Sequence, residues 1–259
     1  MKIAIVGYGK MGHMIENSAR SFGHEIAVTV DVISKDAACI VPQGDYDAVA
    51  KAVKESGAEG IIEFSHPSSV MGNITALLPL GIPLVVGTTG WNDKKEYVNE
   101  LAQKCGGVVM TSANFSIGVN MLYKIIEEAA KLVSQFDEYD ASIFEAHHNQ
   151  KADSPSGTAL DIAKHLLKNY PKKDTIVTES FHEKPKANEL HVASMRVGSV
   201  PGTHTVFFDS NADTIEITHR ARSREGFANG AVHALERLYD GIKSGKLANG
   251  RLYSMEDLF

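Results

Sequence analysis

The stretch KIAIVGYGKMG, residues 2–12, decides how the first half of the chain folds. Its apolar start, residues 2–6, is typical of a strand buried on both faces, and three glycines follow in the spacing GxGxxG. Helical spacing then continues to Phe22, and a second apolar run ends at Asp31, nineteen residues after Gly12. Strand, glycine turn, helix, strand and acid in this order are typical of a dinucleotide-binding site.

Each glycine of this turn has a predicted task. Gly7 permits the tight turn, Gly9 lets a pyrophosphate approach the backbone, and Gly12 lets helix and strand pack closely. The start of the helix adds unpaired N–H groups and a partial positive charge, which favour phosphate. We therefore expect the turn to hold the phosphates of a dinucleotide.

Asp31 predicts which dinucleotide is preferred. Its carboxylate can accept hydrogen bonds from the ribose hydroxyls of NADH, and it repels the extra phosphate of NADPH. Val32 follows, so an adjacent arginine that would bind this phosphate is absent. We expect a preference for NADH, although Lys10 and Lys35 could support NADPH.

The remainder of the first half alternates between strand and helix patterns. Apolar runs occupy residues 60–64, 82–86 and 107–110, and helical periodicity occupies residues 46–56, 69–80 and 94–105. This alternation predicts an α/β fold with a doubly wound parallel (Rossmann) sheet.

Ligands of such sheets bind at the carboxyl ends of the strands. Three polar loops fall there: residues 65–67, 87–90 and 112–115. The first, Ser-His-Pro, we interpret as an ordinary connection. The second, Gly-Thr-Thr-Gly, is suited to wrapping a ribose or a nicotinamide amide.

A different pattern begins after Asn114. A long helix is predicted over residues 120–135, and strands are then predicted over 139–146, 190–197, 203–209 and 214–220. Strands in succession favour an antiparallel or mixed sheet, and hence a second, α+β domain. The polar, proline-containing residues 168–188 are expected to form a surface loop. The final helical pattern, residues 228–244, could belong to either domain.

Composition narrows the class of protein. The 259 residues suffice for two domains, and the net charge of −6 argues against nucleic acid as a partner. The initial apolar run is too short for a signal peptide, and no stretch approaches the ~20 apolar residues of a membrane span. We expect a soluble, cytoplasmic protein.

Residues 145–159, EAHHNQKADSPSGTA, concentrate groups that handle protons and bind anions. Of the adjacent His147 and His148, one can donate a proton while the other orients a substrate. Lys151 adds a positive charge that would stabilise a carboxylate or a developing anion. The segment Ser156-Gly157-Thr158 opens a predicted helix, whose N-terminus is a second anion site. No metal is predicted, because consecutive histidines at a strand end diverge and no HxH, HxxxH or HExxH spacing accompanies them.

The same stretch resembles the signature of the 4-hydroxy-tetrahydrodipicolinate reductase (dihydrodipicolinate reductase) family. The motifs GYGKMG, GTTG, SANFSIGVN and RVGSVPGTHTV extend the likeness over essentially the whole chain. The resemblance implies hydride transfer from NADH or NADPH to a cyclic unsaturated dicarboxylate, in diaminopimelate and lysine biosynthesis. It also implies a dinucleotide-binding domain of residues 1–114 and 228–259. Residues 115–227 would bind the substrate and build a homotetramer.

By this likeness His147 is the proton donor, Lys151 the catalytic lysine, and His148, Gly157 and Thr158 contact the substrate carboxylates. The implied cofactor contacts are Gly7, Tyr8, Gly9, Lys10, Met11, Gly12, Asp31, Gly87, Thr88, Thr89, Ser112, Ala113, Asn114 and Phe115. Two alternatives are a related dehydrogenase of another dicarboxylate or imine, and a redox-inert NAD(P)-sensing protein. The presence of His147 and Lys151 argues against the second.

Overall fold

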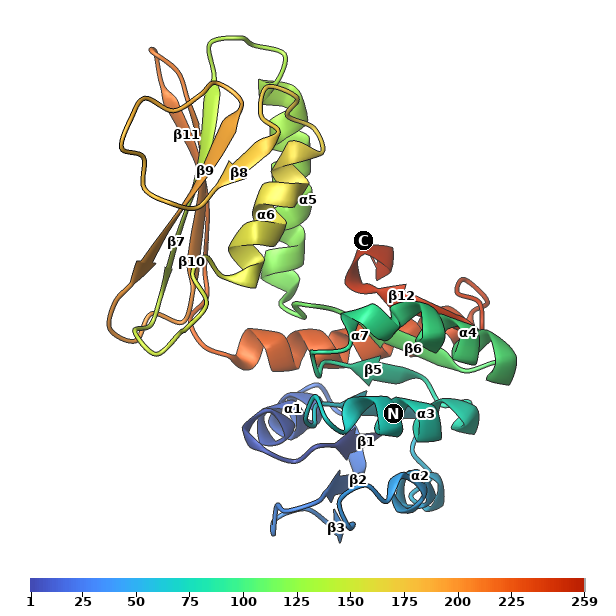
Figure 1. Cartoon of the computed structure of the whole chain (residues 1–259). Coiled ribbons are helices and arrows are strands. Elements are labelled where there is room, and N and C mark those ends of the chain that lie inside the picture. Colours follow the sequence, from blue (N-terminus) through green and yellow to red (C-terminus); the bar gives the residue numbers. More distant parts are fainter. Residues whose placement is uncertain (259) are drawn as a thin grey trace. The chain divides into compact units, whose positions relative to one another are not determined.

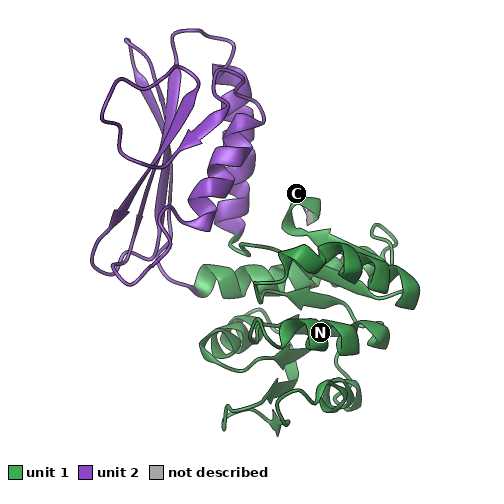
Figure 2. Ribbon diagram, in the orientation of Figure 1, with its two compact units in different colours: residues 1–116, 225–259 green, residues 117–224 purple. Residues whose placement is uncertain are grey.

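The computed structural model describes residues 1–258, so Phe259, the last residue of the expected dinucleotide-binding domain, lies outside it. The chain forms two compact units (Figure 2). Unit 1 comprises residues 1–116 and the C-terminal segment from Glu225, and unit 2 comprises Ile117–Arg224. Within the described residues, no helix has both the length and the apolar composition needed to cross a bilayer.

Unit 1 is built on a parallel sheet in the order β12-β6-β5-β4-β1-β2-β3 (Figure 1). The strands are β1 (Lys2–Val6), β2 (Glu25–Asp31), β3 (Cys39–Ile40), β4 (Gly60–Glu63), β5 (Leu84–Val86), β6 (Val108–Thr111) and β12 (Arg251–Ser254). The strand order reverses at β1, which lies between β2 and β4. Such a switch point is where open parallel sheets bind ligands.

Helices cover both faces of this sheet. They are α1 (Lys10–Ser21), α2 (Tyr46–Glu55), α3 (Val70–Leu77), α4 (Lys95–Cys105) and α7 (Glu225–Lys243), with 3-10 turns η1 (Leu78–Leu80), η2 (Asn92–Lys94) and η3 (Met255–Leu258). Helices α2, α3 and α4 share one apolar core with the sheet, while α7 packs against α1 and β4. The final helical segment, which its pattern alone left unassigned and the family resemblance placed with the dinucleotide-binding domain, belongs to unit 1.

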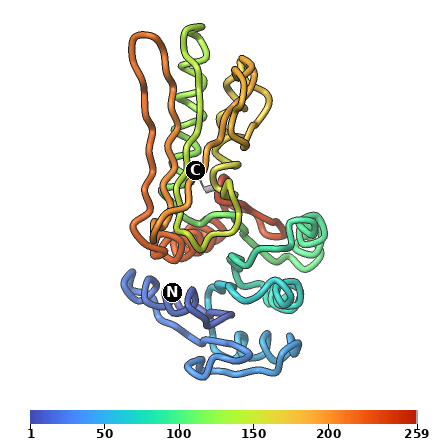
Figure 3. Tube along the Cα trace, turned by 60° about the vertical axis from the view of Figure 1, so that its left-hand side comes forward, coloured from blue at the N-terminus to red at the C-terminus, as the bar shows by residue number. Residues whose placement is uncertain are grey.

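Unit 2 has a mixed sheet in the order β11-β10-β7-β9-β8, packed against two helices. The elements are α5 (Ile117–Val133), β7 (Asp140–His147), α6 (Gly157–Leu167), β8 (Thr175–Val177), β9 (Glu189–Arg196), β10 (Thr203–Asp209) and β11 (Thr214–Arg220). Strands β10 and β11 form an antiparallel hairpin, visible as two adjacent orange runs in Figure 3, whereas β7 and β8 pair with β9 in parallel. The expected fold class, a doubly wound parallel sheet followed by a mixed-sheet α+β domain, is confirmed.

The prediction of a surface loop over residues 168–188 holds for most of this range, which is irregular and largely exposed, but it is wrong for a short strand and two buried side chains. Its Thr175–Val177 portion is strand β8, and Tyr170 is fully buried, with its hydroxyl donating to the carbonyl of Tyr139 at 2.6 Å. Lys173 is also buried, and its Nζ lies 2.7 Å from the Asp140 carboxylate. A three-residue strand is too short to show a periodic pattern, and long-range contacts bury the two polar-tipped side chains.

Candidate functional site

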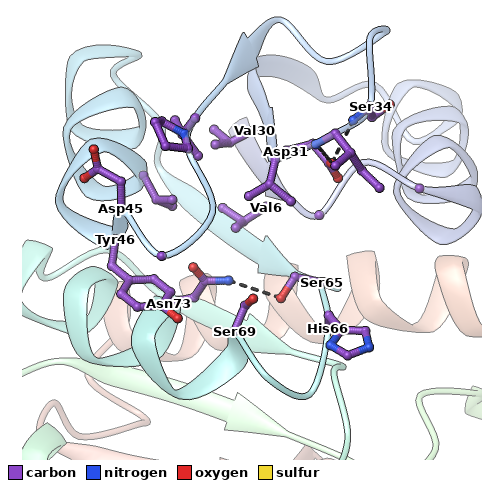
Figure 4. A pocket seen from close by; sticks show the side chains of 18 of the residues that line it. Val6, Val30, Asp31, Ser34, Asp45, Tyr46, Ser65, His66, Ser69 and Asn73 are labelled. Carbon is purple, nitrogen blue, oxygen red and sulfur yellow. Dashed lines mark hydrogen bonds between the residues drawn. The ribbon is translucent and has the colours of Figure 1, made fainter.

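Unit 1 contains a cavity of about 390 Å³ at the carboxyl ends of β1, β2 and β4 (Figure 4). Its lining includes Gly7, Gly9, Asp31, Ser65, His66 and Asn73. Three of these are predicted cofactor contacts. Ser65 and His66 come from the loop that we interpreted as an ordinary connection, so that loop contributes to the cavity wall.

The glycine turn is enforced by close backbone contacts. Gly7 has a φ of +91°, and a Cβ there would lie 2.2 Å from the carbonyl oxygen of Phe64. A Cβ on Gly12 would lie 2.4 Å from the carbonyl oxygen of Gly7. At Gly9 a Cβ would meet no atom within 4 Å, so this backbone faces open space. The turn thus has the shape that a pyrophosphate requires.

Asp31 ends β2 on the wall of this cavity. Its Oδ2 accepts from the backbone N–H of Tyr8 at 2.6 Å, and its Oδ1 accepts from Ile33 and Ser34 at 2.8 and 2.9 Å. Partial burial opposes ionisation, but these backbone donors outweigh it and hold the pKa of Asp31 below its ordinary value. Asp31 is therefore a fixed anion at neutral pH.

None of the other predicted cofactor contacts lines this cavity. Lys10 and Met11 begin α1, and the Tyr8 hydroxyl donates to Glu16. Gly87, Thr88 and Thr89 follow β5, and Ser112, Ala113, Asn114 and Phe115 follow β6. The Thr88 Oγ1 accepts from the Ser65 N–H at 2.7 Å, and the Phe115 ring lies 5.9 Å from that of Phe64. Strands β4, β5 and β6 thus end in loops that contact one another.

Unit 2 contains a buried polar cluster near the end of β7. Nδ1 of His147 donates to Oε2 of Glu145, and Nη1 of Arg196 lies 2.8 Å from the other oxygen of that carboxylate. Strand register produces this cluster, because Arg196 on β9 pairs with His147 and His204 on β10 pairs with Glu145. Neither Glu145 nor Arg196 was predicted as a site residue, since the contact depends on pairing across strands.

Neighbouring groups determine whether Glu145 and His147 are charged. Burial opposes ionisation of Glu145, but hydrogen bonds from Arg196 and His147 hold its pKa below the ordinary value. Burial lowers the pKa of His147 below 6.5, Lys151 and Arg196 lower it further, and Glu145 opposes this change. Because Nδ1 donates to a carboxylate, Nε2 is the ring atom at which His147 gains and loses a proton.

His147 is mostly buried, and the residue beside its Nε2 is a glycine, which has no side chain. A Cβ on Gly202 would lie 3.0 Å from this atom, so glycine keeps the space beside it open. His204 lies edge-on to the His147 ring, at 5.2 Å between centroids. Burial lowers the pKa of His204 to about 4, so its ring is neutral at pH 7.

Glu145, His147 and His204 also form, among residues 1–258, a group of three side chains close enough to share a metal ion. Arg196 already pairs with Glu145, and its positive charge opposes a second cation there. The expectation that no metal is used stays a prediction.

The predicted anion-binding residues follow β7 directly. Nζ of Lys151 lies 2.7 Å from Oδ1 of Asp153, whose carboxylate also accepts from the backbone N–H of Gly157. Ser156 is the N-cap of α6, with its Oγ accepting from the Ala159 N–H at 3.2 Å. Thr158 lies in the first turn, and His148 is half-buried beside His147. Unit 2 therefore brings together the predicted residues His147, His148, Lys151 and Ser156–Thr158.

Comparisons with known proteins identify the family. Residues 1–115 match the family model for the N-terminus of dihydrodipicolinate reductase, and residues 118–259 match the model for its C-terminus. The chain is 35% identical to the 4-hydroxy-tetrahydrodipicolinate reductase of Christiangramia forsetii over 100% of this chain and 97% of the relative. It is 36% identical to that of Archaeoglobus fulgidus, over 99% of both chains.

A solved structure, dipicolinate-bound dihydrodipicolinate reductase from Paenisporosarcina sp. TG-14, matches with a TM-score of 0.78 at 19% identity, covering 100% of this chain and 99% of that one. At this identity the match supports the fold alone. Together with the two family models and the full-length relatives, it leads to one assignment. The chain belongs to the dihydrodipicolinate reductase family, and it is an NAD(P)H-dependent reductase of 4-hydroxy-tetrahydrodipicolinate in lysine biosynthesis.

Proposed function

We propose that unit 2 supplies the proton for this reduction and that Nε2 of His147 is its donor. The observation that carries the proposal is the buried chain from Arg196 through Glu145 to Nδ1 of His147. An anchored Nδ1 fixes the ring and leaves Nε2 beside the space that Gly202 keeps open. NAD(P)H, when bound, supplies the hydride, and His147 then protonates the enamine-like carbon that results.

Binding of the substrate favours protonation of His147. In the free protein the pKa of His147 lies below 6.5, so at neutral pH the ring is mostly neutral. A bound dicarboxylate places negative charge near this ring, and a neighbouring anion raises the pKa of an imidazole. When the substrate binds, His147 therefore takes up the proton that it later donates.

We propose that Lys151, His148 and the segment Ser156–Thr158 bind the substrate carboxylates. Lys151 supplies the charge, and the N-terminus of α6 supplies N–H donors. The Asp153 carboxylate contacts both Lys151 and the Gly157 N–H. Asp153 therefore occupies a position that a substrate carboxylate would take. Its carboxylate must leave these two partners when the substrate binds.

An Asp153→Asn substitution tests this competition. Loss of the competing anion should lower the KM for the dicarboxylate by about threefold, with kcat nearly unchanged. Initial rates at saturating NADH measure both constants. An unchanged or raised KM would show that Asp153 does not compete with the substrate.

We propose that unit 1 binds the dinucleotide in the cavity beside Asp31, with a preference for NADH. The ionised Asp31 supports this, because a second anion at the ribose would be repelled and Val32 offers no compensating charge. Initial-rate curves with NADH and NADPH test the preference. A kcat/KM for NADPH about tenfold above that for NADH would refute it.

The proton-donor role is tested by His147→Gln. We expect kcat to fall by about 10²- to 10⁴-fold, because glutamine has no proton to give. His148→Gln is the matched control, since it should raise the substrate KM and spare most of kcat. Near-full kcat in His147→Gln would exclude this histidine as the acid.

We also propose, from the family resemblance, that the protein acts in the cytoplasm as a homotetramer built through unit 2. Sedimentation velocity at assay concentrations tests the oligomeric state, and a monomer active at those concentrations would contradict it.

A further inference from the structure

Glu63 is a fully buried carboxyl group that the reaction described above does not use. It ends β4, between Val6 of β1 and Val86 of β5, on the sheet face that α3 covers. The sequence gives little sign of it, because it lies within the apolar run of residues 60–64. A charged residue type is almost never fully buried without a partner.

The partners of Glu63 are all neutral. Oε1 accepts from the hydroxyl of Ser65 and from Nδ2 of Asn73, the latter at 3.0 Å, and Thr88 adds a side-chain hydrogen bond. Oε2 has no hydrogen-bond partner. In the part of the chain that the structure describes, no lysine, arginine or histidine pairs with this carboxyl group.

This environment favours the neutral acid. An ionised carboxylate with one bare oxygen and no counter-charge would be costly to bury. Burial accordingly raises the pKa of Glu63 above its ordinary value of 4.5, and the three neutral donors only partly oppose this.

The same hydrogen bonds connect Glu63 to the cofactor cavity. Ser65 and Asn73 line the cavity, and Figure 4 shows the hydrogen bond of 3.1 Å between their side chains. Thr88 belongs to the loop after β5 and accepts from the Ser65 N–H. Its carbonyl also accepts from Nε1 of Trp91 at 2.8 Å. One carboxyl group therefore joins α3 to the loops that follow β4 and β5.

We propose that Glu63 is a neutral carboxylic acid that positions Ser65, Asn73 and Thr88 for cofactor binding. Glu63 is thus a positioning residue and does not contact the reacting atoms. The inference rests on the proposed placement of the dinucleotide in this cavity.

Two substitutions separate charge from positioning. Glu63→Gln keeps a neutral hydrogen-bonding group of the same length and should leave the NADH KM within about twofold of wild type. Glu63→Met keeps the length but removes the acceptor, so Ser65, Asn73 and Thr88 lose their common partner. We expect the NADH KM to rise about tenfold in Glu63→Met with kcat nearly unchanged. Glu59→Gln, an exposed acid just before β4, is the matched control.

The protonation state has its own measurement. The infrared difference spectrum of wild type minus Glu63→Gln at pH 7 should contain a carboxylic-acid C=O band. A carboxylate band in its place, or a tenfold rise of the NADH KM in Glu63→Gln, would contradict the proposal that Glu63 is protonated at pH 7.

Asp31→Ala distinguishes failure of this inference from failure of the cofactor placement. Titration of NADH fluorescence should show weaker binding in both Asp31→Ala and Glu63→Met. If neither variant changes the NADH Kd, the cavity is not the cofactor site. If Asp31→Ala weakens binding while Glu63→Met only lowers the melting temperature, Glu63 is structural and the positioning role is refuted.

Discussion

Glu63 in unit 1 and Glu145 in unit 2 are both fully buried near the carboxyl ends of strands, yet their pKa values move in opposite directions. Glu63 contacts hydroxyl and amide donors, and burial raises its pKa. Glu145 contacts Arg196 and His147, and these partners lower its pKa although its side chain is also closed to solvent. Burial alone therefore does not determine the charge of a glutamate, because the charge of its partners decides between the two forms.

The difference matches the role that we propose for each unit. A neutral acid can hold loops in place without disturbing the negative charge of a nearby dinucleotide. An anion beside an imidazole can orient the ring and stabilise its protonated form. The first arrangement suits the cofactor binding that we propose for unit 1, and the second suits the proton transfer that we propose for unit 2.

The largest expected contrast is in folding stability. In Glu145→Gln the mostly buried guanidinium of Arg196 loses its counter-charge, which should cost about 3–5 kcal/mol of unfolding free energy. Glu63→Gln exchanges one neutral group for another and should cost no more than about 1 kcal/mol. Urea unfolding of the two variants measures both values. Similar losses in the two would show that the carboxyl groups do not differ in charge.

The pH dependence of stability should have opposite signs for the two residues. Glu145 has a depressed pKa, so its contribution is present above pH 4.5 and is lost as pH falls through the folded-state pKa. Glu63 has a raised pKa, so its contribution is full below pH 4.5 and is lost as pH rises towards the folded-state pKa. The deficit of Glu145→Gln should therefore shrink in acid. The stability of Glu63→Gln relative to wild type should therefore increase as pH rises above 4.5.

Unfolding curves at about pH 4, 5.5 and 7 test these opposite pH dependences. Glu100→Gln, which removes an exposed acid of α4, corrects for the general loss of one surface charge. Parallel pH profiles for the two buried variants would contradict opposite charge states.

The pH dependence of turnover tests Glu145 more narrowly. If His147 acts as an acid, kcat/KM should decline as pH rises through the free-enzyme pKa of His147, which lies below 6.5. Glu145 raises this pKa, so Glu145→Gln should move the decline to lower pH. Glu63→Gln should leave it in place. A decline that does not move in Glu145→Gln would show that Glu145 has no influence on the acid.

Much of the fold could be predicted because its signals are local. The Gly7 turn, Asp31 and the alternation of strand and helix patterns correctly predicted the parallel sheet of unit 1. Strands β3, β8 and β12 were missed, since these short strands are only partly buried and lack the fully buried runs of the similarly short β4, β5 and β6.

The candidate site was predictable only in part, for a related reason. His147, Lys151 and Ser156–Thr158 are adjacent in sequence and were named together. Arg196 and His204 join them through strand register alone, which no local pattern encodes. Glu63 escaped notice because an acid inside an apolar run has no motif, and its role follows from three-dimensional contacts.

The smallest expected effect concerns Thr88, and it tests whether Glu63 depends on neutral donors. Thr88→Val keeps the shape of the side chain but removes the hydroxyl that accepts from Ser65 and contacts Glu63. We expect a loss of about 1 kcal/mol of unfolding free energy.

Because the two side chains share a hydrogen bond, the double variant with Glu63→Met should lose less than the sum of the single losses, by about 0.5–1 kcal/mol. The pair Thr88→Val and Glu145→Gln is the control, since these residues lie in different units and should add. Additivity between Thr88 and Glu63 would mean that the network is a set of independent contacts, and the contrast with the ion-paired Glu145 would then rest on charge alone.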